Sequence, residues 1–518
     1  MADKIADVIV IGAGISGLSA AMLLVDAGMD VVVLEARDRV GGRTLTVHDA
    51  AFDYTDLGGA YVGSTQHRVL RMAKDLGLQL YRVYDEKKHI LLLRKSRSSF
   101  YGLIPTIYNP LILFDVNNLY RSLERMSKEI PREAPWRAKR AHEWDSMTFQ
   151  EFLDKTAWMS FTKVMASIIC RDLMTAEPHE LSLLSFLWCL VSGHGAVRLI
   201  STSGGAQERK FVGGAQQLSE CMADRIGSGR VRLSNPVVRV DQDRSTVTVH
   251  TADGDVYRSR YVISAVPQVL LNRIHFEPPL PPLKFQLIQR MPMGSVIKTK
   301  TFYEKAFWRE NNLSGQAYAE TGPILLCLDD TKPDGSHPCL VGFVVADKWK
   351  PFITLTADER MKAVAKEYAE IFCCPQMLTP INYVDKDWTE EEYSGGCYVS
   401  HFPPGVLTSC GETLAQSFDK LFFAGTESAS SWAGYMEGAI LAGERAAREV
   451  LHADGKLAES QILQDEPPAA DAPDEASDET SFVLRVLPSI PTTLAVVVTA
   501  SLVALGAIVF KQLTRPKI

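Results

Sequence analysis

Residues 8–35 constrain the fold more than any other stretch of this 518-residue chain. The stretch begins with a short β-branched run, Val8-Ile9-Val10-Ile11, which is typical of a buried parallel strand. The glycine-rich segment 12–17 follows, then a run with helical spacing, and then a second apolar run at 31–34. This order of strand, glycine turn, helix and strand predicts a βαβ unit that binds a dinucleotide.

Three glycines and one acid carry that prediction. Gly12 permits the tight turn, Gly14 lets the backbone approach a pyrophosphate, and Gly17 lets the helix pack closely on the strand. The phosphates are expected at the helix N-terminus, where unpaired N–H groups and the helix dipole favour an anion. Glu35 ends the second strand, where a ribose-binding carboxylate is expected, and its charge disfavours NADP because it would repel a 2′-phosphate.

Length and composition exclude several classes of protein. A chain of 518 residues is too long for one ordinary core, so two or three domains are expected. A net charge of −7 without basic runs argues against nucleic-acid binding. Nine cysteines without regular spacing predict a reducing compartment, and the eleven histidines form no metal-ligand pattern, so no metal is expected. The first strand begins by residue 8, which leaves no room for a signal or transit peptide.

The C-terminal segment differs from the rest of the chain. Residues 456–485 include a stretch rich in acid, Pro and Ala, which predicts a disordered linker. Arg485 is followed by no charge until Lys511, and the apolar segment 486–510 is long enough to cross a bilayer. A buried core helix is the alternative. With a basic tail at 511–518, we expect a tail-anchored protein with its body facing the cytosol.

The pattern along the chain predicts an α/β fold with a discontinuous Rossmann-like domain. Strand signals return after a helical region and a mixed region, and a buried strand at 421–423 precedes a helix rich in small residues. A dinucleotide fold closed by a distant C-terminal strand and helix is more typical of FAD enzymes than of NAD enzymes. The expected arrangement is an FAD-binding domain at 1–90, 212–290 and 385–455, an α+β substrate domain at 91–211 and 291–384, and a C-terminal transmembrane helix.

Several longer motifs point to a family. They are Gln207-Glu208-Arg209-Lys210-Phe211-Val212-Gly213-Gly214, Gly294-Ser295-Val296-Ile297-Lys298, Ser394-Gly395-Gly396-Cys397-Tyr398, Phe402-Pro403-Pro404-Gly405, Phe423-Ala424-Gly425-Thr426-Glu427 and Trp432-Ala433-Gly434-Tyr435-Met436-Glu437-Gly438-Ala439. In their residues and in their order along the chain, these motifs closely resemble those of the monoamine oxidases. The resemblance runs from residue 8 to about residue 451 and includes the tail anchor.

The resemblance implies a cofactor, a reaction and a location. The cofactor is FAD, bound covalently through its 8α-methyl group to the sulfur of Cys397. The reaction is oxidative deamination of primary and some secondary monoamines, with molecular oxygen, to aldehyde, ammonia and hydrogen peroxide. A homodimer in the mitochondrial outer membrane is also implied. The short span and basic tail suit that membrane as well, although the anchor alone does not exclude the endoplasmic reticulum.

The resemblance also assigns site residues. Tyr398 and Tyr435 match an aromatic pair that flanks the amine, and Lys298 matches a lysine that holds a water at the flavin; these three are the expected catalytic residues. The expected cofactor-binding residues are Gly12, Gly14, Gly17, Glu35, Arg37, Gly42, Arg43, Thr44, Gly59, Ala60, Tyr61, Val237, Trp388, Cys397, Tyr398, Gly425, Thr426, Gly434, Tyr435 and Met436. The expected substrate-binding residues are Leu173, Ile200, Gln207, Leu326, Phe343, Tyr398 and Tyr435.

The substrate cavity departs from the family pattern. The pair Ile200 and Leu326 reproduces neither vertebrate subtype, so the preferred amine and the subtype are not assigned. Asp172 stands where the family has an aliphatic wall residue, and burying an unpaired carboxylate is costly. We expect an ion pair with the adjacent Arg171 that points away from the cavity; the alternative is a carboxylate that faces the cavity and attracts a cationic amine.

Two other functions are compatible with parts of the pattern. A polyamine or amino-acid oxidase of the same superfamily should offer cavity carboxylates or an arginine, whereas the residues matched here are largely apolar and aromatic. A non-catalytic, membrane-tethered flavoprotein would have no reason to keep Cys397, Tyr398, Tyr435 and Lys298 together. The sequence does not distinguish hydride transfer from a polar nucleophilic route of C–H cleavage.

Overall fold

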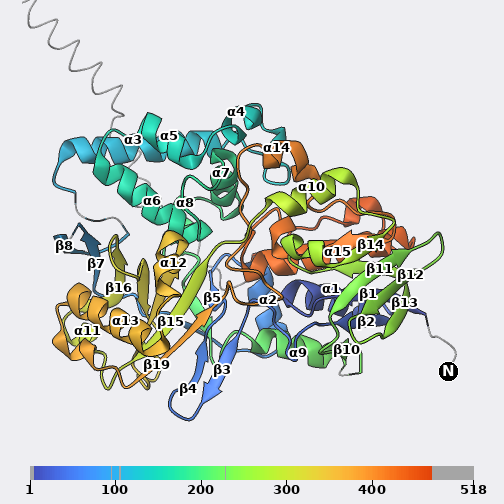
Figure 1. Cartoon of the computed structure of the whole chain (residues 1–518), viewed down its shortest axis with the longest axis horizontal. Helices are drawn as coiled ribbons and strands as arrows, with labels where there is room; N and C mark the ends of the chain where they lie inside the picture. The colour runs from blue at the N-terminus through green and yellow to red at the C-terminus, as the bar shows by residue number, and fades with distance from the viewer. Residues whose placement is uncertain (1–4, 95, 104, 106, 228, 469–518) are drawn as a thin grey trace, which may run out of the picture.

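Two large sheets organise the residues that the computed structural model describes, which are 5–94, 96–103, 105, 107–227 and 229–468 (Figure 1). The first sheet lies on the right of Figure 1. Its strand order is β10 (Val231–Arg232), β2 (Val31–Leu34), β1 (Ala6–Ile11), β13 (Val256–Ser264), β12 (Val247–Thr251), β11 (Val237–Gln242) and β14 (His275–Glu277), with β20 (Leu421–Phe423) beside β13.

The predicted βαβ unit is confirmed at the centre of this sheet. Strand β1 pairs in parallel with β2 and with β13, and α1 (Ile15–Asp26) connects β1 to β2. Val8, Ile9 and Val10 are fully buried, as a parallel strand covered on both faces requires. Gly12 takes a φ of +101° at the turn, a conformation that L side chains rarely adopt.

The second sheet lies at the lower left of Figure 1. Its order is β19 (Asn382–Asp387), β15 (Val296–Phe302), β18 (Cys339–Val345), β17 (Leu326–Asp329), β16 (Leu313–Ala319), β7 (Lys88–Leu93) and β8 (Ser96–Phe100). One face carries Ile297 and Val344 and packs against α13 (Ala357–Phe372) through Tyr368. Because side chains alternate along a strand, Val296 and Lys298 project from the opposite face.

A layer of helices covers the top of the molecule in Figure 1. It contains α3 (Pro110–Ser127), α4 (Ala141–Asp145), α5 (Phe149–Thr156), α6 (Ser160–Met174), α7 (Leu183–Ser192) and α8 (Ala196–Ile200). These helices confirm the helical region that the sequence pattern predicts before the strand signals return. Helix α3 begins after Asn109, whose side chain caps it by accepting from the Leu111 N–H, with Pro110 in the first turn.

Smaller elements complete the described residues. The short strands are β3 (Thr46–Asp49), β4 (Asp53–Asp56), β5 (Tyr61–Val62), β6 (Leu80–Arg82) and β9 (Arg209–Phe211). The other helices are α2 (His67–Asp75), α9 (Gln217–Ile226), α10 (Pro282–Arg290), α11 (Phe307–Glu310), α12 (Trp349–Phe352), α14 (Val406–Cys410) and α15 (Met436–Ala453). Helix α15 is the small-residue helix that the sequence predicts after residue 423.

Helices α1 and α15 approach so closely that their backbones touch. A Cβ added at Gly443 of α15 would lie 2.1 Å from the carbonyl oxygen of Ser16 in α1. The N–H of Gly425, in the turn that leads from β20 toward α15, donates to the Ser16 hydroxyl at 2.9 Å. Segments from the two ends of the chain therefore form one packed unit on the first sheet.

The C-terminal predictions fall mostly outside the described residues. The predicted span at 486–510, the basic tail at 511–518 and most of the 456–485 linker belong to the part that the structure does not describe. Among the described residues, no helix combines the length and hydropathy needed to cross a membrane. The described start of the linker contacts α2, where Arg71 donates to Glu466 at 2.7 Å and Arg68 donates to the Gln464 carbonyl at 2.6 Å.

The contact between α1 and α15 gives a first prediction. Gly443→Ala should lower the free energy of unfolding by about 1–3 kcal/mol, because the new methyl group overlaps the Ser16 carbonyl and forces the helices apart. Urea unfolding at matched cofactor content measures the effect. Gly229→Ala is the control, since a Cβ there meets no atom within 4 Å. Equal unfolding midpoints for the two variants would contradict this account of the helix contact.

Candidate active site

A cavity of about 350 Å³ lies between the two sheets. The ends of β1 and β2, the face of the second sheet and the N-terminal ends of α1 and α15 all contribute to its wall. The sequence-predicted site residues that line it are Gly12, Gly14, Glu35, Arg37, Gly42, Arg43, Thr44, Gly59, Ala60, Tyr61, Leu173, Gln207, Val237, Lys298, Leu326, Phe343, Trp388, Cys397, Tyr398, Gly425, Thr426, Gly434, Tyr435 and Met436.

Two predicted site residues are not part of this wall. Gly17 lies behind the glycine turn, and a Cβ there would come within 1.9 Å of the Gly12 carbonyl oxygen, so it permits the close approach of helix and strand. Ile200 ends α8 and packs, partly buried, against the core of the helical layer. Ile200 is not among the lining residues, although that core includes residues that are, such as Trp188 and Ala206.

The end of the cavity near β1 has the form of an anion and ribose site. Helix α1 begins after Gly14 with no side chain capping its first N–H groups, so these donors are open to an anion. The Glu35 carboxylate accepts from the N–H of Ala13 at 2.7 Å and from the N–H of Arg37 at 2.9 Å. Glu35 thereby ties the glycine turn to the following loop, whose Gly42 approaches Gly14 closely.

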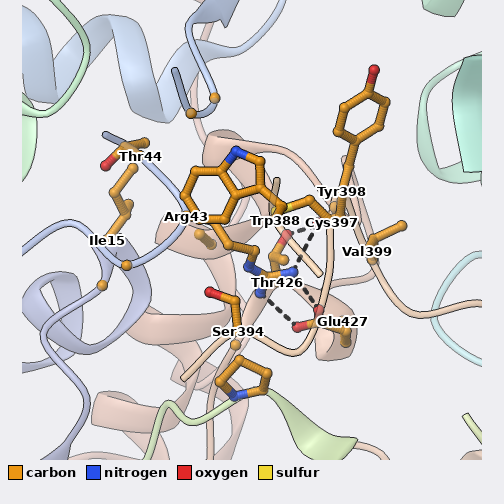
Figure 2. Close-up of a pocket in the computed structure, with 18 of the residues that line it drawn as sticks. Ile15, Arg43, Thr44, Trp388, Ser394, Cys397, Tyr398, Val399, Thr426 and Glu427 are labelled. Atoms are coloured by element: carbon orange, nitrogen blue, oxygen red, sulfur yellow. Dashed lines mark hydrogen bonds and ion pairs between the residues drawn. The ribbon is translucent and has the colours of Figure 1, made fainter. Parts of the chain in front are cut away.

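An ion pair joins that loop to the middle of the cavity, as Figure 2 shows. The Arg43 guanidinium donates to both oxygens of Glu427, at 2.6 and 3.1 Å, and to the carbonyl of Tyr398 at 2.9 Å. The Glu427 side chain is almost fully buried. The sequence did not predict Glu427 as a site residue, although the motif 423–427 includes it. An acid that directly follows a buried strand was the available signal.

Cys397 is held on both sides by backbone hydrogen bonds. Its N–H donates to the carbonyl of Gly294 at 3.0 Å, and its carbonyl accepts from the Thr175 hydroxyl at 2.8 Å. The Tyr398 N–H donates to the same hydroxyl at 3.1 Å. Burial raises the pKa of the Cys397 thiol to about 12, against the opposing effect of the Arg43 guanidinium. Thr175, at the left-handed C-cap of α6, is a contact that no sequence pattern signalled.

Aromatic rings line the far part of the cavity. The Tyr398 ring meets the edge of Phe343 with centroids 6.2 Å apart, and the Tyr435 ring meets Trp432 at 5.0 Å. Burial raises the pKa of both Tyr398 and Tyr435 well above the ordinary value, so both phenols are neutral. Two neutral, partly buried rings on one cavity can orient an apolar or weakly basic group between π faces.

Lys298 and Trp388 fix the loop between them. The Lys298 amine donates to the Gly58 carbonyl at 2.7 Å, and the Trp388 indole donates to the Leu57 carbonyl at 2.9 Å. Only glycine fits at position 58, because a Cβ would lie 2.4 Å from the Arg43 carbonyl oxygen. Burial, together with the nearby Lys300 and Lys210, lowers the pKa of Lys298 well below its ordinary value. The cavity therefore contains an amine that is readily neutral.

The prediction of an ion pair between Arg171 and Asp172 is wrong. Arg171 donates instead to Glu177, at 2.8 and 2.9 Å, because the chain turns back after α6 and presents that carboxylate to it. Asp172 lines the cavity and accepts from the hydroxyl of Tyr318 at 3.2 Å. Burial raises the pKa of Asp172 to about 7.

No metal site is visible in the part of the chain that the structure describes. There, no group of three or more His, Cys, Asp or Glu side chains gathers around a point where an ion could bind. The donors of the cavity are instead backbone N–H groups at two helix ends, a thiol, an amine and phenols. This set suits an organic cofactor with a phosphate end and an aromatic end.

Comparison with known proteins gives matches over most of the chain. The family model described as flavin containing amine oxidoreductase matches residues 15–451. Amine oxidase [flavin-containing] B of Rattus norvegicus is 48% identical over 511 residues, covering 98% of each chain. Amine oxidase [flavin-containing] of Danio rerio is 49% identical over 486 residues, covering 93% of each. The solved structure of cyclohexylamine oxidase from Brevibacterium oxydans IH-35A has a TM-score of 0.84 and 32% identity, covering 87% of this chain and all of that one.

The buried ion pair gives a second prediction. Glu427→Gln should lower the free energy of unfolding by about 2 kcal/mol or more, because Arg43 then keeps its charge in the cavity wall without a carboxylate. The control is Glu143→Gln, which removes an exposed pair with Arg140 at the start of α4 and should change stability by no more than about 0.5 kcal/mol. Urea unfolding of both variants makes the comparison. A loss no larger for Glu427→Gln than for the control would contradict the structural role of the pair.

Proposed function

The chain belongs to the family of flavin-containing amine oxidoreductases, and from that membership we propose that it is a monoamine oxidase. The substrates are primary and some secondary amines, and the products are aldehyde, ammonia and hydrogen peroxide. The observation that carries the proposal is one cavity in which a dinucleotide-type glycine turn, Cys397 and two partly buried tyrosines meet. A glycine turn alone would support only cofactor binding, whereas the tyrosines add a place for the amine.

The residues present fit FAD. The open N–H groups of α1 would hold the pyrophosphate, Glu35 the ribose and the backbone at Val237 the adenine end. The N-terminus of α15 also has no side-chain cap and reaches the cavity at Met436, so its dipole would favour the electron-rich edge of the ring. When bound, the flavin supplies a two-electron acceptor that molecular oxygen restores.

The chain's own residues would position the amine. The neutral rings of Tyr398 and Tyr435 would flank the nitrogen and direct its lone pair. The apolar side chains of Leu173, Leu326 and Phe343 exclude water from the wall, which favours the uncharged amine that oxidation requires. Lys298, whose pKa is lowered by burial, would hold a water molecule with the hydrogen-bonding capacity that the Gly58 carbonyl leaves free.

Cys397 is proposed as the site of covalent attachment, through its sulfur and the flavin 8α-methyl group. Forming this bond would remove the thiol proton and one hydrogen of the methyl group; the flavin itself would accept the two electrons, and oxygen would reoxidise it. The guanidinium charge of Arg43, followed by that of Arg37, favours the thiolate. The backbone on both sides of Cys397 is fixed by Gly294 and Thr175, so the sulfur is held in place before the cofactor arrives.

The wider organisation stays a proposal drawn from the sequence. We assign residues 1–90, 212–290 and 385–455 to the FAD-binding domain and residues 91–211 and 291–384 to the substrate domain. We propose a single membrane span at 486–510, a homodimer, and a place in the mitochondrial outer membrane with the body facing the cytosol.

The proposed function has a direct test. Benzylamine added to the purified flavoprotein without oxygen should abolish the absorbance of the oxidised flavin, and air should restore it with one hydrogen peroxide per aldehyde. A flavin that stays oxidised with benzylamine, phenylethylamine and serotonin would overturn the proposal. Turnover of spermine alone would favour a polyamine oxidase instead.

The covalent link gives a separate prediction. After acid precipitation, the wild-type pellet should keep its yellow colour, whereas Cys397→Ala should release all flavin to the supernatant, because no other bond holds it. Cys410→Ala is the matched control, since Cys410 is buried but lies outside the cavity wall. Complete release from the wild-type protein would refute covalent attachment without touching the amine oxidase proposal.

A further inference from the structure

The spacing of the strands in the second sheet gives the distances along the substrate cavity. Lys298 of β15 pairs directly with Phe343 of β18, Phe343 with Leu326 of β17, and Leu326 with Tyr318 of β16. Residues directly opposite in antiparallel strands project from the same face, so these four side chains form one row. At a strand spacing of about 4.8 Å, Tyr318 lies roughly 10 Å from Phe343 and 14 Å from Lys298, measured along the sheet.

The two ends of this row differ in chemistry. Beside Lys298 at one end, Phe343 contacts the ring of Tyr398, where the reacting amine is proposed to bind. At the other end, the Tyr318 hydroxyl donates to one oxygen of Asp172, which reaches the cavity from α6. Between the ends lies the apolar side chain of Leu326.

Asp172 has no cation of its own among the described residues. There, no Lys, Arg or His comes within ion-pair distance of its carboxylate, and the adjacent Arg171 is engaged by Glu177. The hydrogen bond from Tyr318 occupies one oxygen, and the other has no hydrogen-bond donor among the described residues. A carboxylate kept in an apolar wall with one hydrogen bond is costly unless a cation joins it.

We propose that Asp172, oriented by Tyr318, determines specificity by binding the distal ammonium group of a diamine while its other amino group is oxidised beside Tyr398 and Tyr435. This inference rests on the proposed amine oxidase function and narrows its substrate class. The reaction is unchanged: the α C–H bond breaks, two electrons pass to the bound flavin and then to oxygen, and water releases ammonia to leave an aminoaldehyde.

The spacing selects the length of the diamine. An extended chain advances about 1.2 Å per bond, so the two nitrogens of 1,5-diaminopentane lie roughly 7 Å apart. That span fits between the tyrosine rings and a carboxylate opposite Tyr318. Longer polyamines would place further charges against the apolar Leu173 and Leu326. The other carboxylates of the wall are already engaged, Glu35 by backbone N–H groups and Glu427 by Arg43.

The decisive measurement compares two amines of equal length. For the wild-type protein at pH 8, kcat/KM for 1,5-diaminopentane should exceed that for n-pentylamine, and Asp172→Asn should lower this ratio at least about tenfold, because the ammonium loses its charged partner. Asp154→Asn is the control, since that carboxylate is exposed on α5 and should leave the ratio unchanged.

A binding measurement separates recognition from turnover. Pentyltrimethylammonium has no lone pair to be oxidised, so calorimetry can follow its binding to the flavin-loaded protein; the wild type should bind it at least about tenfold more tightly than Asp172→Asn. If Asp172→Asn changes neither the ratio of kcat/KM values nor the affinity for pentyltrimethylammonium, the inference is overturned. Turnover of n-pentylamine in the same experiment would still uphold the proposed function. A loss confined to tyramine relative to phenylethylamine would also overturn it, since the carboxylate would then bind a phenol. Failure of every amine, including benzylamine, would reject the proposed function itself.

Discussion

The site depends on the contact between two helices whose backbones meet where one of them carries a glycine. Ser16 and Gly443 bring the backbones of α1 and α15 together, and the Ser16 hydroxyl also holds the turn after β20. Because both helices begin at the cavity, this contact places two N-termini without side-chain caps at the same cavity. A dinucleotide has its negative charge at the pyrophosphate and its electron-rich edge at the ring, so one helix end can serve each. Residues more than 400 positions apart thus direct two helix dipoles toward one cofactor site.

The second sheet supplies two buried lysines with opposite electrostatic surroundings. Lys298 and Lys300 lie two residues apart on β15 and project from the same face. Lys300 pairs with Asp330, which also accepts from Lys210 at 2.6 Å, and these two ammoniums lower the pKa of Asp330 despite its burial. Lys298 has a backbone carbonyl in place of a carboxylate, and burial lowers its pKa. The Asp330 carboxylate compensates its neighbours and leaves Lys298 as the readily neutral amine of the cavity.

The sequence predicted those parts of the molecule whose conformation depends on residues close together in the chain. The strand, turn and helix around Gly12 follow from spacing and from the φ that the turn requires, and the small residues of α15 follow from composition. The same reasoning could not locate Thr175, whose hydroxyl holds the Cys397–Tyr398 peptide, because the contact joins residues 222 positions apart with no motif of its own. Ile200 shows a second limit, since it matches a family substrate position but is not itself among the residues that line the cavity.

The position of Asp172 shows why a neighbour in sequence is a poor guide to an ion pair. Successive residues on a helix point about 100° apart, so Arg171 and Asp172 of α6 do not face each other. After α6, Thr175 adopts a left-handed conformation that reverses the chain and brings Glu177 to Arg171. The arginine is thereby engaged outside the cavity, and the aspartate is left on the inner face with Tyr318. The turn at residue 175 therefore orders the peptide of Cys397 and, through the same reversal of the chain, frees a carboxylate to select among amines.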